Sequence, residues 1–170
     1  MNEVMPTARE EFNAVIQFCK GLGVDIGCGT NRLDPSVLTI DVYPHKDADM
    51  VMNSKVLPFR DNVFDFVFSS HCLEDFEPSE IKAVLTEWLR CVKIGGRLVL
   101  LLPDMEGGRY PKVEDGGNPS HKVNVGVNYM KNIIKDLPVE VEQVDTIDHS
   151  RFFTFDIVLK KTGGIKHGKA

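Results

Sequence analysis

Short apolar runs, bounded by glycine, proline and polar residues, recur along the chain and predict a series of strands. The run at 98–102 is continuously apolar, which is typical of a central parallel strand covered on both faces. We expect the last two runs to pair antiparallel, because only a short link at 148–151 joins them. The predicted strands are 22–26, 37–42, 50–52, 63–69, 98–102, 139–144 and 152–159.

Three other segments repeat their apolar residues at the spacing of one helical face and therefore predict helices. Thr7 and Glu10 form a capping-box pattern at the start of the first segment. Pro78 suits the first turn of the second helix, and Gly95 suits its end. The predicted helices are 8–19, 78–92 and 128–137.

The alternation of strands and helices predicts an α/β fold. We expect a Rossmann-like, mostly parallel sheet with helices on both faces and an antiparallel C-terminal strand. The length suits a single domain over 1–162, followed by a flexible tail at 163–170. Between strand 98–102 and helix 128–137, the glycine-rich segment 106–119 is an unusually long loop, and such loops often carry function.

Composition narrows the possible partners and compartment. The 170 residues are 42% hydrophobic and 26% charged, with a net charge of −5, so a nucleic-acid partner is disfavoured. No apolar stretch reaches membrane-spanning length and the first residues do not resemble a signal peptide, so we expect a cytoplasmic protein with no membrane contact. The four cysteines have no metal-binding or disulfide spacing, and we predict no metal site.

A glycine loop follows the first strand and indicates a nucleotide-like ligand. Gly27 and Gly29 allow backbone N–H groups to approach such a ligand closely. Asp41 ends the second strand, where a carboxylate can accept hydrogen bonds from a ribose. Dinucleotide-binding loops share these features but have a third glycine, where this chain has Arg32. The segment between the two strands is short and contains Pro35, so we expect no crossover helix and no pyrophosphate site.

Five pieces of sequence, in this order, resemble the class I S-adenosylmethionine-dependent methyltransferases, and in particular their short type 11 branch. Together they span 24–102, about half of the chain. They are VDIGCGT at 24–30, TIDV at 39–42, LPFRDNVFD at 57–65, SSHCLEDF at 69–76 and LRCVKIGGRLVLLL at 89–102.

This resemblance implies S-adenosylmethionine as the cofactor and assigns residues to it. Asp41 would hold the ribose hydroxyls and Val42 would pack on the adenine. The family often has an aspartate where this chain has Asn53, whose amide oxygen can still accept a hydrogen bond from the adenine amino group. The implied cofactor-binding residues are Asp25, Gly27, Cys28, Gly29, Asp41, Val42, Asn53, Ser54, Ser70 and His71.

The catalytic residue is unknown from the sequence, and His71 is a weak candidate for a general base. Asp104 and His121 are weaker candidates still. Several neighbouring residues have simpler interpretations: Asp25 bonding to loop amides, Cys28 in packing, and Glu74 and Asp75 as helix first-turn charges. We also expect Trp88, Phe152, Phe153 and Phe155 to pack in the interior, and Lys160, Lys161, Lys166 and Lys169 to form a solvated basic tail.

The sequence therefore favours a methyltransferase with a small-molecule acceptor, and a sugar or glycan hydroxyl is an acceptor suggested by the family alone. The loop at 104–122 would form a lid or acceptor wall, and a second copy or a partner subunit would complete the pocket. Two alternatives remain open: a weak or inactive cofactor-binding module that supports a partner protein, and, less favoured, an NAD-dependent oxidoreductase.

Overall fold

One seven-stranded sheet organises the residues that the computed structural model describes, 8–146 and 154–165, in the order β3-β2-β1-β4-β5-β7-β6. The first five strands are parallel, and β7 pairs antiparallel with both β5 and β6. The strands are β1 (Gly23–Ile26), β2 (Leu38–Asp41), β3 (Met50–Val51), β4 (Phe64–Ser70), β5 (Val92–Pro103), β6 (Val139–Thr146) and β7 (Thr154–Lys161).

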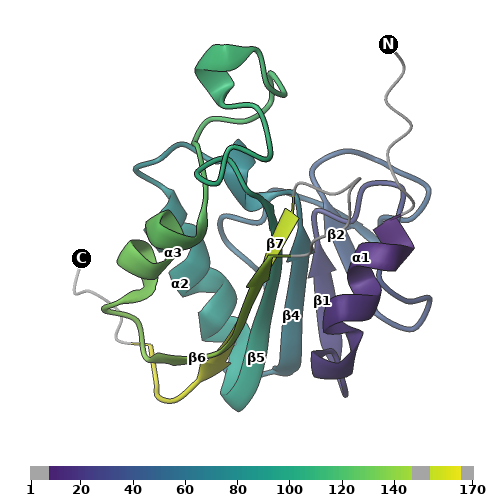
Figure 1. Cartoon of the computed structure of the whole chain (residues 1–170). Helices are drawn as coiled ribbons and strands as arrows, with labels where there is room; N and C mark the ends of the chain where they lie inside the picture. Colours follow the sequence, from purple (N-terminus) through teal and green to yellow (C-terminus); the bar gives the residue numbers. More distant parts are fainter. Residues whose placement is uncertain (1–7, 147–153, 166–170) are drawn as a thin grey trace.

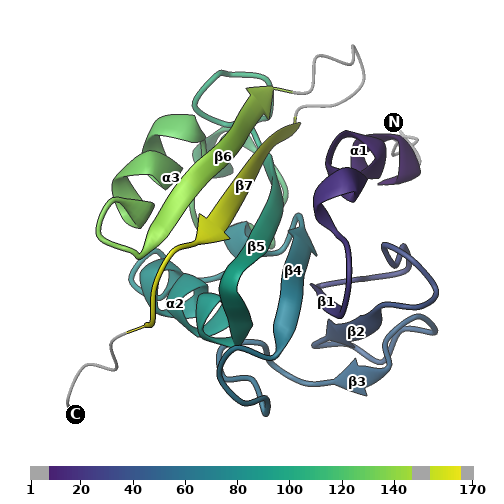
Figure 2. The ribbon, with the colours of Figure 1, turned by 90° about the horizontal axis from the view of Figure 1, so that it is seen from below.

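Helices cover both faces of the sheet, as Figures 1 and 2 show. Helix α1 (Ala8–Val15) lies on one face, where Phe12 packs edge-on against Phe68 of β4 with ring centroids 5.1 Å apart. Helices α2 (Ile81–Cys91) and α3 (Val127–Ile134) lie on the other face, where Trp88 is fully buried in the larger core. The predicted Rossmann-like α/β fold is thus confirmed.

Strand β5 is much longer than the sequence predicts, and this corrects the predicted end of the second helix. The helix ends at Cys91 and the strand begins at the next residue, Val92. Gly95 has φ +84° and lies inside the strand, where the β4–β5 register shifts between Phe64 and Phe66. The glycine therefore permits a bend in a strand and does not terminate the helix.

Two other boundary assignments change. The first helix gives way at Ile16–Phe18 to a 3-10 turn, so it is shorter than predicted. Ile165, which we placed in a flexible tail, packs against the larger core. Thr7 of the expected capping box lies outside the described residues, as does the predicted link at 148–151. No helix in the described ranges combines the length and apolarity needed to cross a bilayer.

The expectation of a solvated basic tail is wrong for Lys161, which is only 1% exposed. Its ammonium group donates hydrogen bonds to the Asn62 side chain at 2.9 Å and to the Val92 carbonyl at 2.7 Å. Lys161 therefore holds the turn before β4 and the start of β5 against the end of β7. Phe155 is fully buried, as predicted, whereas Phe152, Phe153, Lys166 and Lys169 lie outside the described residues.

Candidate active site

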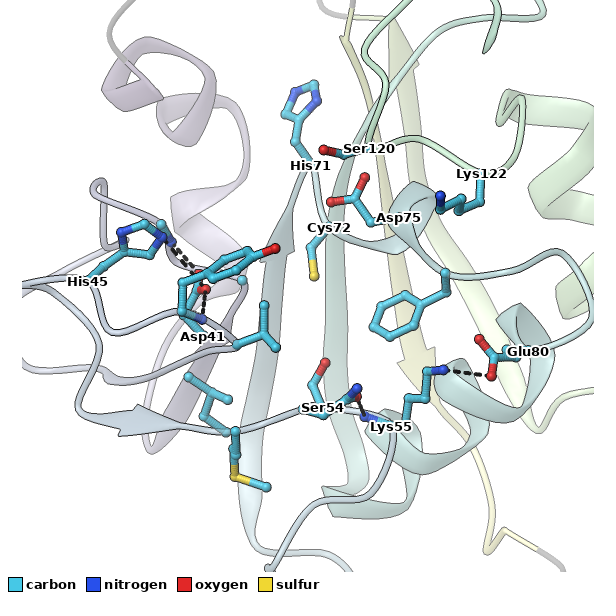
Figure 3. A pocket seen from close by; sticks show the side chains of 18 of the residues that line it. Asp41, His45, Ser54, Lys55, His71, Cys72, Asp75, Glu80, Ser120 and Lys122 are labelled. Carbon is cyan, nitrogen blue, oxygen red and sulfur yellow. Dashed lines mark hydrogen bonds and ion pairs between the residues drawn. The ribbon is translucent and has the colours of Figure 1, made fainter. Parts of the chain in front are cut away.

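A cavity of about 640 Å³ opens at the carboxyl ends of β1, β2 and β4 (Figure 3), which is where open parallel sheets bind ligands. Its volume suits a ligand of nucleoside size or larger. Side chains and backbone from five separate segments line it. The lining includes Gly27, Gly29, Asp41, Val42, Tyr43, Asn53, Ser54, His71, Cys72, Asp75, Ser120 and Lys122.

The glycine loop and the carboxylate that ends β2 meet on one wall of this cavity. Asp41 accepts a hydrogen bond from the Gly29 N–H at 2.9 Å and another from the Tyr43 N–H at 2.9 Å. Gly27 has φ +75°, and a Cβ added there would lie 2.6 Å from the Cys72 sulfur. Glycine is therefore required at this position by both the backbone conformation and the packing.

The segment after the glycine loop forms no helix before β2 begins at Leu38, as the sequence predicts. Asp25 organises this segment, because its carboxylate accepts the Leu33 N–H at 2.8 Å. Burial raises the pKa of Asp25 to about 7. Asp25 is 1% exposed and does not line the cavity, so the structure gives it a role in holding the loop.

The β2 end of the cavity presents apolar side chains next to polar backbone. Val42 and Tyr43 are 56% and 65% exposed and line the cavity, so both can pack on a ligand there. The Asn53 amide oxygen accepts the Lys55 N–H at 2.9 Å and keeps a second lone pair for another donor. The backbone of Ser54 is held from the core side, because its carbonyl accepts the Trp88 indole N–H at 2.9 Å.

His71 lies at the other end of the cavity, with φ +50° and both ring nitrogens turned toward protein groups. Its Nε2 is 3.0 Å from the Thr154 hydroxyl, which donates its own hydrogen to Glu11 at 2.8 Å. Its Nδ1 is 3.5 Å from a Glu74 carboxylate oxygen. Burial alone would lower the pKa of His71, but interactions with Glu11 and Glu74 outweigh it and raise the pKa. The ring is therefore held as an imidazolium near neutral pH.

Glu74 and Asp75 are first-turn acidic residues, as the sequence suggests, but of a 3-10 helix and not of an α-helix. They lie in a short 3-10 turn, Leu73–Asp75, directly after β4. Glu74 is fully buried, and its backbone carbonyl accepts the Lys122 N–H at 2.8 Å. The long loop thus folds back over the end of β4, and Ser120 and Lys122 become part of the cavity wall (Figure 3).

The two weaker catalytic candidates lie beside the cavity. Asp104 is 5% exposed and accepts the Gly107 N–H at 2.9 Å, so it closes a local turn. His121 is also 5% exposed, with its ring next to that of Tyr110, and burial lowers its pKa. Neither residue lines the cavity.

Most of the residues assigned to the cofactor from sequence come together here. Those that line the cavity are Gly27, Gly29, Asp41, Val42, Asn53, Ser54 and His71, whereas Asp25, Cys28 and Ser70 do not. Sequence reasoning did not assign Cys72 or Asp75 to a site. Both lie within the SSHCLEDF piece just after a strand, and a position at the end of a strand could have indicated a site residue. Ser120 and Lys122 belong to the long loop at 104–122 that the sequence predicts as an acceptor wall, although the sequence did not single out these two residues.

Residues 24–100 match a family model described as a methyltransferase domain. No curated protein is similar enough in sequence to count as a relative. The match covers four of the five sequence pieces in full and nearly all of the fifth. It confirms the resemblance to class I methyltransferases.

Solved structures with this fold cover nearly the whole chain. One is a methyltransferase in complex with the Haloferax volcanii Trm112 methyltransferase activator, with a TM-score of 0.73, 14% identity and coverage of 92% of this chain and 91% of that one. A Thermotoga maritima SAM-dependent methyltransferase has a TM-score of 0.69 at 19% identity, covering 89% and 88%. A Burkholderia thailandensis 1,6-didemethyltoxoflavin-N1-methyltransferase, solved with that compound and S-adenosylhomocysteine, has a TM-score of 0.69 at 12% identity, covering 95% and 80%.

These findings imply S-adenosylmethionine as the cofactor, and the cavity fits it. A buried carboxylate with unused lone pairs, exposed apolar side chains and an amide oxygen are the groups that an adenosine requires. Asp41, Val42 and Asn53 provide groups of these kinds in the cavity lining.

Proposed function

We propose, from the premise that this chain carries a class I methyltransferase domain, that it transfers the methyl group of S-adenosylmethionine to a small molecule. The observation that carries the proposal is the contact between the Gly29 N–H and Asp41 beside the exposed Val42. It brings a glycine loop, a ribose-binding carboxylate and an apolar adenine surface to one end of a single cavity.

Each part of the site has a distinct task in this proposal. Asp41 accepts hydrogen bonds from the ribose hydroxyls, Val42 and Tyr43 pack on the adenine, and Asn53 accepts from its amino group. Gly27 and Gly29 allow close approach of the backbone, as their φ values of +75° and +52° permit. The bound cofactor supplies an electrophilic methyl group, so the protein mainly aligns a nucleophile and excludes water.

Calorimetry with S-adenosylmethionine, S-adenosylhomocysteine and NAD tests this assignment. We expect both sulfur compounds to bind and NAD not to bind, because no helix follows the glycine loop to receive a pyrophosphate. Binding of NAD without binding of either sulfur compound would replace the methyltransferase with the oxidoreductase alternative.

The acceptor and the compartment are also part of the proposal. A small molecule suits the cavity, whose outer wall is made by the loop that contains Ser120 and Lys122. A sugar or glycan hydroxyl is one such acceptor. The four cysteines are free thiols, which suits a reducing compartment such as the cytoplasm.

A second candidate is a cofactor-binding module that needs a partner chain, and one surface feature favours it. Strand β3, only two residues long, forms one edge of the sheet; its residue Val51 is 55% exposed, and Val56, five residues further along the chain, is 74% exposed. A neighbour of the same fold is found with an activator protein. Methyl transfer by the purified chain alone would exclude this candidate, whereas cofactor binding without transfer over an acceptor panel would favour it.

A further inference from the structure

Two carboxylates of the cavity wall, those of Asp75 and Glu77, are not used by the fold, and Asp75 is the one that directly follows the buried Glu74. Asp41 is held by two backbone N–H groups, and Glu80 forms an ion pair with Lys55 at 2.6 Å. The side chain of Asp75 has no hydrogen bond or ion pair to any residue in the described part of the chain. Figure 3 shows its carboxylate pointing into the space between Cys72 and Ser120.

The groups around Asp75 control its affinity for a proton. Partial burial, and then the negative charge of Glu74, raise the pKa of Asp75 to about 6. The positive charges of His71 and Lys122 act in the opposite direction. An acid with such a pKa is ionised at neutral pH and yet holds a proton well enough to take one from a reacting molecule.

Glu74, whose negative charge helps to raise the pKa of Asp75, lies in the protein interior, where a charged group is destabilising. It is fully buried, and neither of its carboxylate oxygens has a hydrogen-bond partner among the described residues. The nearest nitrogens are His71 Nδ1 at 3.5 Å and His121 Nε2 at 3.6 Å. A buried carboxylate with such loose contacts reduces stability, so its place directly behind a cavity wall calls for a functional reason.

Among the described residues, His71 is the histidine that lines this end of the cavity, and it is poorly placed to act as a base. Its Nε2 bonds to Thr154 and its Nδ1 faces Glu74, so neither nitrogen offers a lone pair to a molecule in the cavity. The carboxylates of Glu11 and Glu74 on its two sides also keep it protonated.

On the basis of the proposed function, we propose that Asp75 accepts the proton that the methyl acceptor loses, and that this acceptor is a hydroxyl or an amine. A lone pair of the acceptor oxygen or nitrogen forms the new bond to the methyl carbon, and the electrons of the broken O–H or N–H bond stay on that atom. The carbon–sulfur bond breaks with its electrons left on sulfur, and the proton moves to an Asp75 carboxylate oxygen before it is released to water. Acceptors that are already anionic, such as carboxylates and thiolates, have no proton to give and are repelled by the charge of Asp75.

The first test measures Asp75 itself and requires no acceptor. In a carbon-detected NMR titration, the carboxyl signal that disappears in Asp75→Asn should titrate near pH 6. In Glu74→Gln it should titrate at lower pH, because a neighbouring negative charge has been removed. A titration in the ordinary aspartate range in the wild-type protein would overturn the proposal.

The second test compares Asp75→Asn with Asp115→Asn, the same change at an exposed position of the long loop outside the cavity lining. Over a panel of hydroxyl, amine, carboxylate and thiol compounds, we expect the wild type to methylate hydroxyls or amines. Its rate should fall as pH drops below about 6, and Asp75→Asn should lose about 100-fold or more of it, on the order of a general base. Asp115→Asn should match the wild type.

Binding of S-adenosylhomocysteine, measured by calorimetry, separates the two proposals. If the wild type does not bind it, the proposed function fails. If the wild type and Asp75→Asn bind it with affinities within about threefold of each other, the proposed function stands. The role of Asp75 is then refuted if Asp75→Asn keeps the wild-type methylation rate, or if only anionic acceptors react.

Discussion

Replacement of Asp41 with alanine should weaken both the fold and the binding of the cofactor. The carboxylate is 8% exposed and accepts the N–H groups of Gly29 and Tyr43, each at 2.9 Å. Without it, the Gly29 N–H loses its acceptor at a partly buried position. The glycine loop then loses its link to the end of β2.

The expected loss of folding stability in Asp41→Ala follows from these two hydrogen bonds. A hydrogen bond to a charged group contributes about 1.5–3 kcal/mol, and the exposed Tyr43 recovers part of its loss from water, so we expect a loss of about 2–4 kcal/mol. For a chain of this length, that corresponds to a fall in Tm of roughly 5–15 °C. Loss of the ribose contact should weaken cofactor binding by about 1–3 kcal/mol, or roughly 5- to 150-fold.

Thermal unfolding of the ligand-free protein and calorimetry with S-adenosylhomocysteine at low temperature measure the two effects separately. Asp115→Ala is the control, because Asp115 is exposed and outside the cavity. Asp41→Asn keeps one acceptor oxygen and should lose less stability than the alanine variant. An unchanged Tm in Asp41→Ala would show that this carboxylate does not hold the loop, and unchanged affinity would remove it from the cofactor site.

Three further predictions concern the loop and the core. Gly27→Ala should reduce cofactor affinity at least tenfold and lower the Tm, because the new Cβ would lie 2.6 Å from the Cys72 sulfur in a backbone conformation with φ +75°. A variant with the same affinity, measured by calorimetry, and the same Tm as the wild type would contradict this prediction. The raised pKa of Asp25, about 7, means that the folded state holds an extra proton above pH 4, so stability should fall as pH rises from about 4 to 7, and urea unfolding of Asp25→Asn should show a flatter slope. Lys161→Met keeps the buried stem but leaves the Val92 carbonyl and Asn62 without their donor, which should cost about 1–3 kcal/mol in urea unfolding; equal stability would show that the ammonium group is dispensable.

Local patterns were sufficient to predict that the glycine loop and Asp41 lie together in the cavity wall. The glycine loop and Asp41 each follow a short strand, and parallel neighbours place their carboxyl ends at one edge. The contact between Gly29 and Asp41 follows directly from this geometry. The same reasoning predicts the absence of a helix before β2.

The acceptor end could not be predicted in this way, because it depends on contacts between distant segments. The burial of Glu74 results from a loop that returns to it near Lys122, and the ring of His71 is fixed by Thr154 from the far end of the chain. Local spacing also misled us at Gly95, where the glycine that suits a helix end instead allows a strand to bend. Lys161 was misread because a charged residue near the end of a sequence is normally solvated.

The position of β7 has a consequence for biogenesis. Although it is the last strand of the described chain, it lies between β5 and β6, and it pairs along β5 from Arg97 to Pro103. During synthesis, the backbone groups of β5 that pair with β7, and the apolar side chains around them, therefore stay exposed until residues 154–161 have left the ribosome. Nascent chains stalled before this strand should depend on chaperones, whereas chains released after it can close the sheet at once.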